Sequence, residues 1–192
     1  MKFKEIESKY HANEIKMADF TRLMEELNPN KKLTVSSYDD YFINEKDDFI
    51  RYRHNDDVGE LTIKRKINPK NNIERVEINL PIAESNFLKI KEFVSLLGYR
   101  HNFTIYKTCK IYWINNKVIS YYMVYDENIK ELGRFIEIEA DETHEWKSEK
   151  EALEEINKFE KLLLPLGLNN KNRLRKSLFE MFRKGNNNEV IS

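Results

Sequence analysis

The amino-acid sequence predicts an α+β fold: an eight-stranded antiparallel β-barrel with a polar, charged interior and helices packed outside it. Two observations favour this fold class. Eight segments have the composition and alternation of strands, and five short stretches place charged side chains two residues apart, where they share one face of a strand. The residues between these charges are often apolar, as at Tyr52, Val76 and Ile138. We expect closure of the barrel to gather the charged faces inside and leave helices to cover the apolar exterior.

The first half of the chain is expected to supply five strands and two helices. A strand over 2–11 precedes a helix over 15–27, which Asn28-Pro29-Asn30 ends. Asn, Asp and Gly separate the four segments that come next, which predict strands over 33–44, 48–55, 59–67 and 72–80. An amphipathic helix over 84–97 follows, and Gly98 closes it.

The second half is expected to supply three strands and two helices. The strands are predicted over 101–115, 117–126 and 133–141, and Asn115-Asn116 is a suitable hairpin turn between the first two. One helix over 148–164 ends at Pro165, and another over 172–184 ends at Gly185. Because no repeat or linker divides the chain, we expect one domain over 1–185 and a frayed tail over 186–192.

Composition is typical of a globular protein and excludes several partners. Of the 192 residues 40% are hydrophobic, and the formal net charge is zero, so no global field favours duplex nucleic acid. Cys109 is the only cysteine, which rules out an intrachain disulfide. No apolar run follows Met1 or approaches the ~20 residues of a membrane span. We therefore expect a cytoplasmic monomer or homodimer without a membrane partner.

The charged faces differ in sign along the chain. Carboxylates occupy the first and last predicted strands, and cations occupy the strands between them. Charges that line an enclosed space are costly unless they are paired or bind a ligand, so the pattern favours a binding site. Carboxylates hold divalent cations, and basic side chains hold phosphate. The sequence therefore predicts a site for a metal-bound polyphosphate.

The residues that carry these charges resemble a known family. Glu5-Ile6-Glu7-Ser8-Lys9 resembles the ExExK signature of the CYTH superfamily, the triphosphate tunnel metalloenzymes. That family includes class IV adenylyl cyclases, thiamine triphosphatases and inorganic triphosphatases. The likeness continues in family order through Asp40-Tyr41-Phe42, the RxR strand at 51–53, the TxKxK strand at 62–66, the strand pair at 125–140 and the final helix at 173–182.

The resemblance implies an eight-stranded tunnel in which basic side chains grip a triphosphate and acidic ones hold Mg²⁺ or Mn²⁺. The implied metal ligands are Glu5, Glu7, Glu137 and Glu139, which together with Lys9 form the implied catalytic set. The implied phosphate-binding residues are Lys9, Arg51, Arg53, Lys64, Lys66, Lys107 and Lys110.

The chain departs from the family's pattern on the sixth strand, where the family usually has a K-x-R pair. Lys107 and Lys110 stand there three residues apart, so a strand without a bulge cannot aim both inward. If Lys107 faces inward, Cys109 occupies the position of the arginine. Near the final helix, Ser177-Leu178 replaces the family's Ser-Tyr, so any role of that tyrosine hydroxyl is missing.

Three functions fit these residues. We favour a metal-dependent phosphohydrolase acting on a nucleoside triphosphate, thiamine triphosphate or tripolyphosphate, because no segment of the sequence can be identified as a purine-binding pocket. The alternatives are a class IV adenylyl cyclase, which converts ATP to cyclic AMP and pyrophosphate, and a non-catalytic binder of a nucleotide or polyphosphate. Tyr38, Tyr41 and Tyr122 either stack on a base or belong to the core. His11 is a general base or a histidine at the rim, and Asp126 is a neighbour of the metal or a turn residue.

Overall fold

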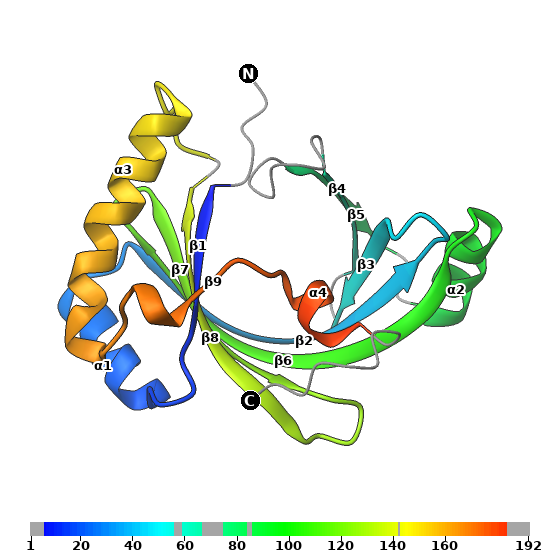
Figure 1. Ribbon diagram of the computed structural model, residues 1–192, viewed down its shortest axis with the longest axis horizontal. Coiled ribbons are helices and arrows are strands. Elements are labelled where there is room, and N and C mark those ends of the chain that lie inside the picture. Colours follow the sequence, from blue (N-terminus) through cyan, green and yellow to red (C-terminus); the bar gives the residue numbers. More distant parts are fainter. Residues whose placement is uncertain (1–5, 56–58, 67–74, 84–85, 142, 184–192) are drawn as a thin grey trace. The chain divides into compact units, whose positions relative to one another are not determined.

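The computed structural model describes residues 6–55, 59–66, 75–83, 86–141 and 143–183 (Figure 1). Glu5 and the predicted tail over 186–192 lie outside these ranges. The structure gives the backbone of residues 64–66 and 75–77 but does not describe their side chains. The predicted roles of Glu5, Lys64 and Lys66 therefore stay predictions.

The described strands form one antiparallel sheet, which confirms the predicted fold class. The sheet has nine strands in the order β5-β4-β3-β2-β6-β7-β8-β1-β9, one more than expected. In this order β5 and β9 stand at the two ends, so the pairing of the described strands does not show the predicted closure. The strands are β1 (Glu7–His11), β2 (Lys31–Ile43), β3 (Phe49–His54), β4 (Gly59–Lys66), β5 (Arg75–Ile82), β6 (Arg100–Ile114), β7 (Lys117–Tyr125), β8 (Glu131–Ala140) and β9 (Arg173–Leu174).

Four α-helices accompany the sheet in the described part of the chain: α1 (Met17–Glu26), α2 (Phe87–Leu96), α3 (Glu149–Glu160) and α4 (Leu178–Phe182). The predicted helix over 148–164 is α-helical only as far as Glu160. It then tightens into a 3₁₀ segment over Lys161–Leu166 that contains Pro165, which has no N–H to donate. None of the helices in the described ranges has the length and apolar character that spanning a bilayer requires.

The end of the chain differs most from its prediction, because the expected helix over 172–184 is two elements. Arg173 and Leu174 form β9, which pairs with β1 and is the ninth strand. The helix α4 begins only at Leu178, where Ser177 and Glu180 form a capping box that satisfies the first N–H groups. The hairpin between β6 and β7 turns at Asn115 and Asn116, both with positive φ, as predicted.

The described residues belong to two compact units. The first unit comprises Met1–Ser36 and Lys107–Arg175, and the second comprises Ser37–Tyr106 and Lys176–Ser192. The long strands β2 and β6 each contribute one part to each unit. Each predicted site residue therefore belongs to one unit, and each unit has its own core.

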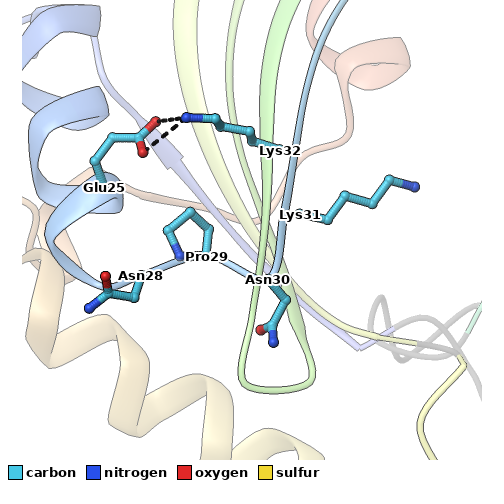
Figure 2. A pocket seen from close by; sticks show the side chains of 6 residues that line it. All are labelled: Glu25, Asn28, Pro29, Asn30, Lys31 and Lys32. Carbon is cyan, nitrogen blue, oxygen red and sulfur yellow. Dashed lines mark hydrogen bonds and ion pairs between the residues drawn. The ribbon is translucent and has the colours of Figure 1, made fainter.

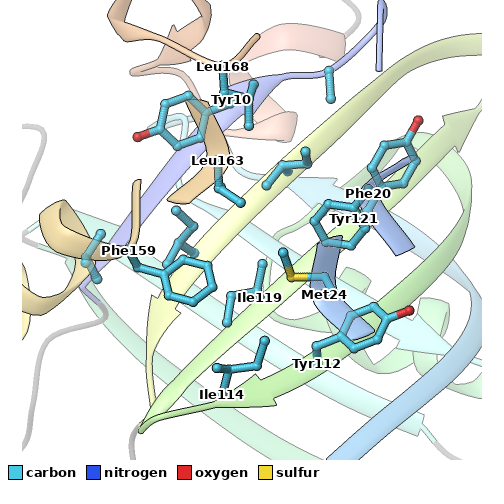
Figure 3. Close-up of a cluster of buried hydrophobic side chains, with 14 of the residues drawn as sticks. Tyr10, Phe20, Met24, Tyr112, Ile114, Ile119, Tyr121, Phe159, Leu163 and Leu168 are labelled. Atoms are coloured by element: carbon cyan, nitrogen blue, oxygen red, sulfur yellow. The ribbon is translucent and has the colours of Figure 1, made fainter. Parts of the chain in front are cut away.

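In the first unit, the sheet has one apolar face and one charged face. The apolar face packs against α1 and α3 and buries Phe20, Met24, Ile119, Tyr121 and Phe159 (Figure 3). Because side chains alternate along a strand, the neighbours of Ile119 and Tyr121 on β7 point to the other face. That second face carries most of the predicted carboxylates.

In the second unit, helices contact both faces of the sheet. The helix α2 packs against Phe42, Ile50, Tyr52 and Leu61. The helix α4 contacts the opposite face, where the ring of Phe179 stacks 4.2 Å from that of Phe49. The sequence predicted helices only on the outside of the sheet. On the face that carries Arg51, aromatic side chains give α4 an apolar surface against which it packs.

Candidate functional site

The charged face of the first unit brings together carboxylates from two adjacent strands. On β1 and β8, Glu7 lies directly opposite Glu139, and Lys9 lies directly opposite Glu137. Directly opposed residues in an antiparallel pair project to the same side. Three of the four predicted metal ligands therefore share one face with Lys9.

Lys9 is the centre of this cluster. Its Nζ atom lies 2.7 Å from Oε1 of Glu137 and 3.5 Å from Oε1 of Glu7. Only 8% of Lys9 is exposed, whereas the Glu137 side chain keeps 22% of its surface accessible. An ammonium buried to this degree requires an anionic partner, and Glu137 provides it.

The pKa values of both partners favour the charged forms. Burial alone would lower the pKa of Lys9, but the neighbouring carboxylates, Glu137 foremost, raise it well above its usual value. Burial alone would raise the pKa of Glu137, yet the Lys9 ammonium and a hydrogen bond with Glu7 hold it well below its usual range. The pair of Lys9 and Glu137 therefore stays ionised across the physiological pH range.

The strand β6 adds Lys107 to the same face. Its Nζ atom lies 5.4 Å from the ring centroid of Tyr122, and its charge also lowers the pKa of Glu137. Cys109 follows at the same parity, and it adds to the raised pKa of Tyr122, to which burial and the charges of Glu137 and Glu7 contribute more. Lys107 and Cys109 therefore occupy the two positions where the family usually has Lys and Arg.

Lys110 points to the other face of β6. Its Nζ atom donates a hydrogen bond of 3.1 Å to Oγ1 of Thr21, on α1. The expectation that Lys110 lines the charged face is therefore corrected: three residues of separation place it with the apolar side and α1, as a strand without a bulge requires. Of Lys107 and Lys110, only Lys107 lies beside Glu137.

In the second unit, each predicted arginine is fixed by partners from a neighbouring strand. The Nε and Nη2 atoms of Arg53 donate to the two carboxylate oxygens of Asp39 at 2.8 and 2.9 Å. The Nη2 atom of Arg51 donates to Oγ1 of Thr62 at 2.8 Å and lies 3.3 Å from Oε1 of Glu60. The side chains of Arg51 and Arg53 are 12% and 34% exposed, so both are held by neighbours while part of each surface stays accessible.

The sequence analysis missed the partners of these arginines. Asp39 is fully buried and lies directly opposite Arg53, and Glu60 is also opposite Arg53, on β4. The family likeness drew attention to the adjacent Asp40, which lies on the α2 face and accepts a hydrogen bond from Thr104. Alternation along β2 could have pointed to Asp39. It lies two residues from Tyr41, which is paired with Arg51, so Asp39 shares the face of that arginine.

The residues with two open readings now have definite surroundings. The His11 ring lies tilted against that of Phe135, with centroids 5.3 Å apart, and burial lowers the pKa of His11, which favours its neutral form. Asp126 accepts hydrogen bonds from the backbone N–H groups of Asn128 and Lys130, so it holds the turn before β8. Tyr41 packs among Phe49, Phe103 and Phe179, and Tyr38 packs against His54 and Tyr106.

The described carboxylates suit a divalent cation that is only partly held by protein. Glu7, Glu137 and Glu139 offer the hard oxygen donors that Mg²⁺ and Mn²⁺ prefer. No three His, Cys, Asp or Glu side chains among the described residues already form a metal-binding group. Mg²⁺ is commonly held by one or two carboxylates together with waters and substrate phosphates, so this donor set fits such an ion.

A separate pocket lies at the turn between α1 and β2 and is lined by Glu25, Asn28, Pro29, Asn30, Lys31 and Lys32 (Figure 2). Its two lysines are engaged: Lys32 pairs with both oxygens of Glu25, and Lys31 lies over the ring of Trp113 at 4.5 Å. The pocket contains none of the predicted site residues.

Comparison with known proteins agrees with the likeness seen in the sequence. The model of the CYTH domain family matches residues 4–177. A conserved hypothetical protein from Pyrococcus furiosus is similar at 27% identity and a TM-score of 0.72, covering 93% of this chain and 99% of its own. A Pyrococcus horikoshii protein is similar at 29% identity and a TM-score of 0.66, covering 92% and 97%.

A proposed adenylate cyclase from Vibrio parahaemolyticus shares the fold at 12% identity and a TM-score of 0.66, covering 94% of this chain and 98% of its own. At that identity the likeness concerns the fold alone. No curated protein matches the chain.

Proposed function

The chain belongs to the CYTH family, and we propose that it is a divalent-metal-dependent phosphohydrolase acting on a substrate that carries a triphosphate group. The family includes triphosphatases and cyclases, so membership supports chemistry on a triphosphate. The observation that carries the proposal is the cluster of Glu7, Lys9 and Glu137, in which two carboxylates and a buried ammonium meet at 2.7 and 3.5 Å. A purely structural ion pair would need only one carboxylate.

The proposed metal ligands are Glu7, Glu137 and Glu139, with Glu5 completing the set. A bound Mg²⁺ or Mn²⁺ supplies a Lewis acid that activates a water and neutralises charge on the phosphoryl group. Lys9 lies beside Glu137 and Glu7, and its charge keeps Glu137 ionised and available to a cation.

The proposed phosphate ligands are basic residues of both units. In the first unit they are Lys9 and Lys107, both buried beside Glu137. In the second they are Arg51 and Arg53, which hydrogen bonds to Thr62 and Asp39 hold in place before any ligand binds. Pre-positioned guanidinium groups lose less conformational freedom when they bind an oxyanion. Lys64 and Lys66 complete the proposed set, and Lys110 is left out of it.

Hydrolysis is favoured over cyclisation because its nucleophile is water. Cyclisation requires the ribose 3′-hydroxyl to be fixed in line with the α-phosphorus, and therefore a site for the nucleoside. Of the three tyrosines considered for stacking on a base, Tyr41 and Tyr122 are each only 3% exposed, whereas Tyr38 is 44% exposed. The ring of Tyr38 already packs against His54 and Tyr106, which supports a hydrolase that recognises the triphosphate itself.

The test is incubation of the purified chain with tripolyphosphate, thiamine triphosphate and ATP in the presence of Mg²⁺ or Mn²⁺, with products separated by chromatography. We expect release of orthophosphate from more than one of these compounds. Cyclic AMP formed in step with pyrophosphate, with tripolyphosphate unchanged, would establish the cyclase instead. Binding of tripolyphosphate without any product would establish a non-catalytic binder.

A further inference from the structure

A tyrosine hydroxyl on the charged face of the first unit lacks a partner. Tyr122 lies on β7 opposite Phe135, two residues along the strand from the pair formed by Ser120 and Glu137, so it shares the face of Glu137. The residue is 3% exposed, and within the described part of the chain its hydroxyl has no hydrogen-bond partner. A buried hydroxyl normally has one, because leaving it unpaired is costly.

The neighbouring tyrosine shows how this chain treats a buried hydroxyl that serves only the core. Tyr121 points to the apolar face, and its hydroxyl donates a hydrogen bond of 2.7 Å to the backbone carbonyl of Ile15. The buried hydroxyls of Tyr10 and Thr108 also lack partners among the described residues. Each of these residues follows a lysine of the charged face in its strand, so its side chain points to the opposite face. Among the described residues, only the hydroxyl of Tyr122 is unpaired beside the proposed phosphate ligands.

Two ammonium groups and two carboxylates act on Tyr122. The Lys107 ammonium lies over its ring at 5.4 Å, and the Lys9 charge acts on its hydroxyl. Neither ammonium can accept a hydrogen bond. The nearby carboxylates of Glu137 and Glu7 lie 2.7 and 3.5 Å from the Lys9 ammonium. A phenol keeps its proton at neutral pH. Two ammonium groups and one phenol complement an oxyanion.

We propose that the Tyr122 hydroxyl donates a hydrogen bond to a non-bridging oxygen of the bound polyphosphate, beside Lys9 and Lys107. Tyr122 is then a substrate-binding residue, and its unpaired state in the free protein is resolved when the phosphate arrives. This inference rests on the proposed function and deepens it, because it assigns a neutral donor to a site otherwise built from charges. A neutral donor adds affinity without adding charge to compete with the metal.

The variant that tests this is Tyr122→Phe, which removes one oxygen and keeps the ring that stacks on Phe135 at 5.4 Å. Its matched control is Tyr121→Phe, which makes the same change one residue away on the other face. We expect Tyr122→Phe to bind tripolyphosphate about 10- to 100-fold more weakly, since hydrogen bonds to charged groups have that effect on affinity. We expect Tyr121→Phe to bind like the wild type.

Thermal unfolding should give the reverse order. Tyr122→Phe should melt at or above the wild-type temperature, because an unpaired buried hydroxyl is removed. Tyr121→Phe should melt at a lower temperature, because its hydrogen bond to Ile15 is lost. Both variants are measured as the full chain, by calorimetric titration with tripolyphosphate and by thermal scans with and without it.

The outcomes separate this inference from the function on which it rests. If the wild type does not bind tripolyphosphate, the proposed function fails and the inference falls with it. If the wild type binds and Lys107→Ala weakens binding, yet Tyr122→Phe binds as tightly as the wild type, the inference alone is overturned. A ligand-induced rise in melting temperature that is smaller in Tyr122→Phe than in Tyr121→Phe supports it.

Discussion

At the scale of single residues, the account depends on the pair of Lys9 and Glu137. The family resemblance assigned Lys9 to phosphate and Glu137 to metal. The structure adds that the two side chains are partners, because Glu137 lies 2.7 Å from an ammonium whose residue is only 8% exposed. Removing either charge leaves the other poorly solvated.

Lys9→Met is therefore expected to lower the free energy of unfolding by about 3 kcal/mol, as breaking a buried ion pair does. Glu137→Gln should destabilise the protein in the same direction. The double variant should recover part of the loss, because two neutral side chains leave no unpaired charge. Urea denaturation of the four proteins measures this. Strictly additive losses would show that the two side chains do not interact.

Acid should remove the contribution of this pair, and alkali should leave it intact until a high pH. Although burial opposes it, Lys9 lowers the pKa of Glu137, so the stabilisation is complete above the unfolded value of about 4.3 and is lost as the pH falls through the folded value. The pKa of Lys9 is raised, so its contribution is complete below about 10.4 and is lost above that.

The measurement is the difference in unfolding free energy between the wild type and Lys9→Met as a function of pH. We expect it to be largest at alkaline pH and to shrink as the pH falls, because burial raises the pKa of Glu137 in Lys9→Met and the protonated side chain no longer needs an ammonium partner. A difference that stays constant down to about pH 4 would assign the effect to another group.

At the scale of elements, alternation along the strands decides which predicted residues share a face. It correctly groups Glu7 with Lys9 and Glu137 with Glu139, because each pair is two residues apart. It also separates Lys107 from Lys110, which the sequence left open because a bulge would have allowed both on one face. Asp39 was missed although it shares the strand face of Tyr41, because the pairing that places it opposite Arg53 is not visible in the sequence.

The two lysines of β6 provide a matched pair for this alternation. Lys107→Ala should weaken binding of tripolyphosphate by about 10- to 100-fold, since it removes a charge-assisted hydrogen bond. Lys110→Ala should leave affinity unchanged, because its ammonium is bound to Thr21 on the side of α1. Equal losses in the two variants, measured by calorimetric titration, would contradict the observed face of β6.

At the scale of the whole molecule, the family and the antiparallel α+β fold followed from the sequence, because charge spacing and family motifs extend along most of the chain. The secondary structure of the last segment could not be predicted from the sequence in the same way. The segment 172–184 has helical periodicity, yet Arg173 and Leu174 pair with β1 and the helix begins after Ser177. Pairing with a distant strand overrides local propensity, and no local pattern announces it.

The central claim is that carboxylates of the first unit bind a divalent ion that is required for turnover. Glu139→Gln tests it most directly, because Gln keeps the volume and Glu139 is not the partner of Lys9 in the described ion pairs. The measurement is the rate of orthophosphate release from tripolyphosphate with Mg²⁺ or Mn²⁺, for the wild type, for the wild type with excess chelator, and for Glu139→Gln. The account predicts that chelator abolishes release and that Glu139→Gln releases phosphate at least about 100-fold more slowly while melting near the wild-type temperature. Release that is unaffected by chelator and equally fast in Glu139→Gln would contradict it.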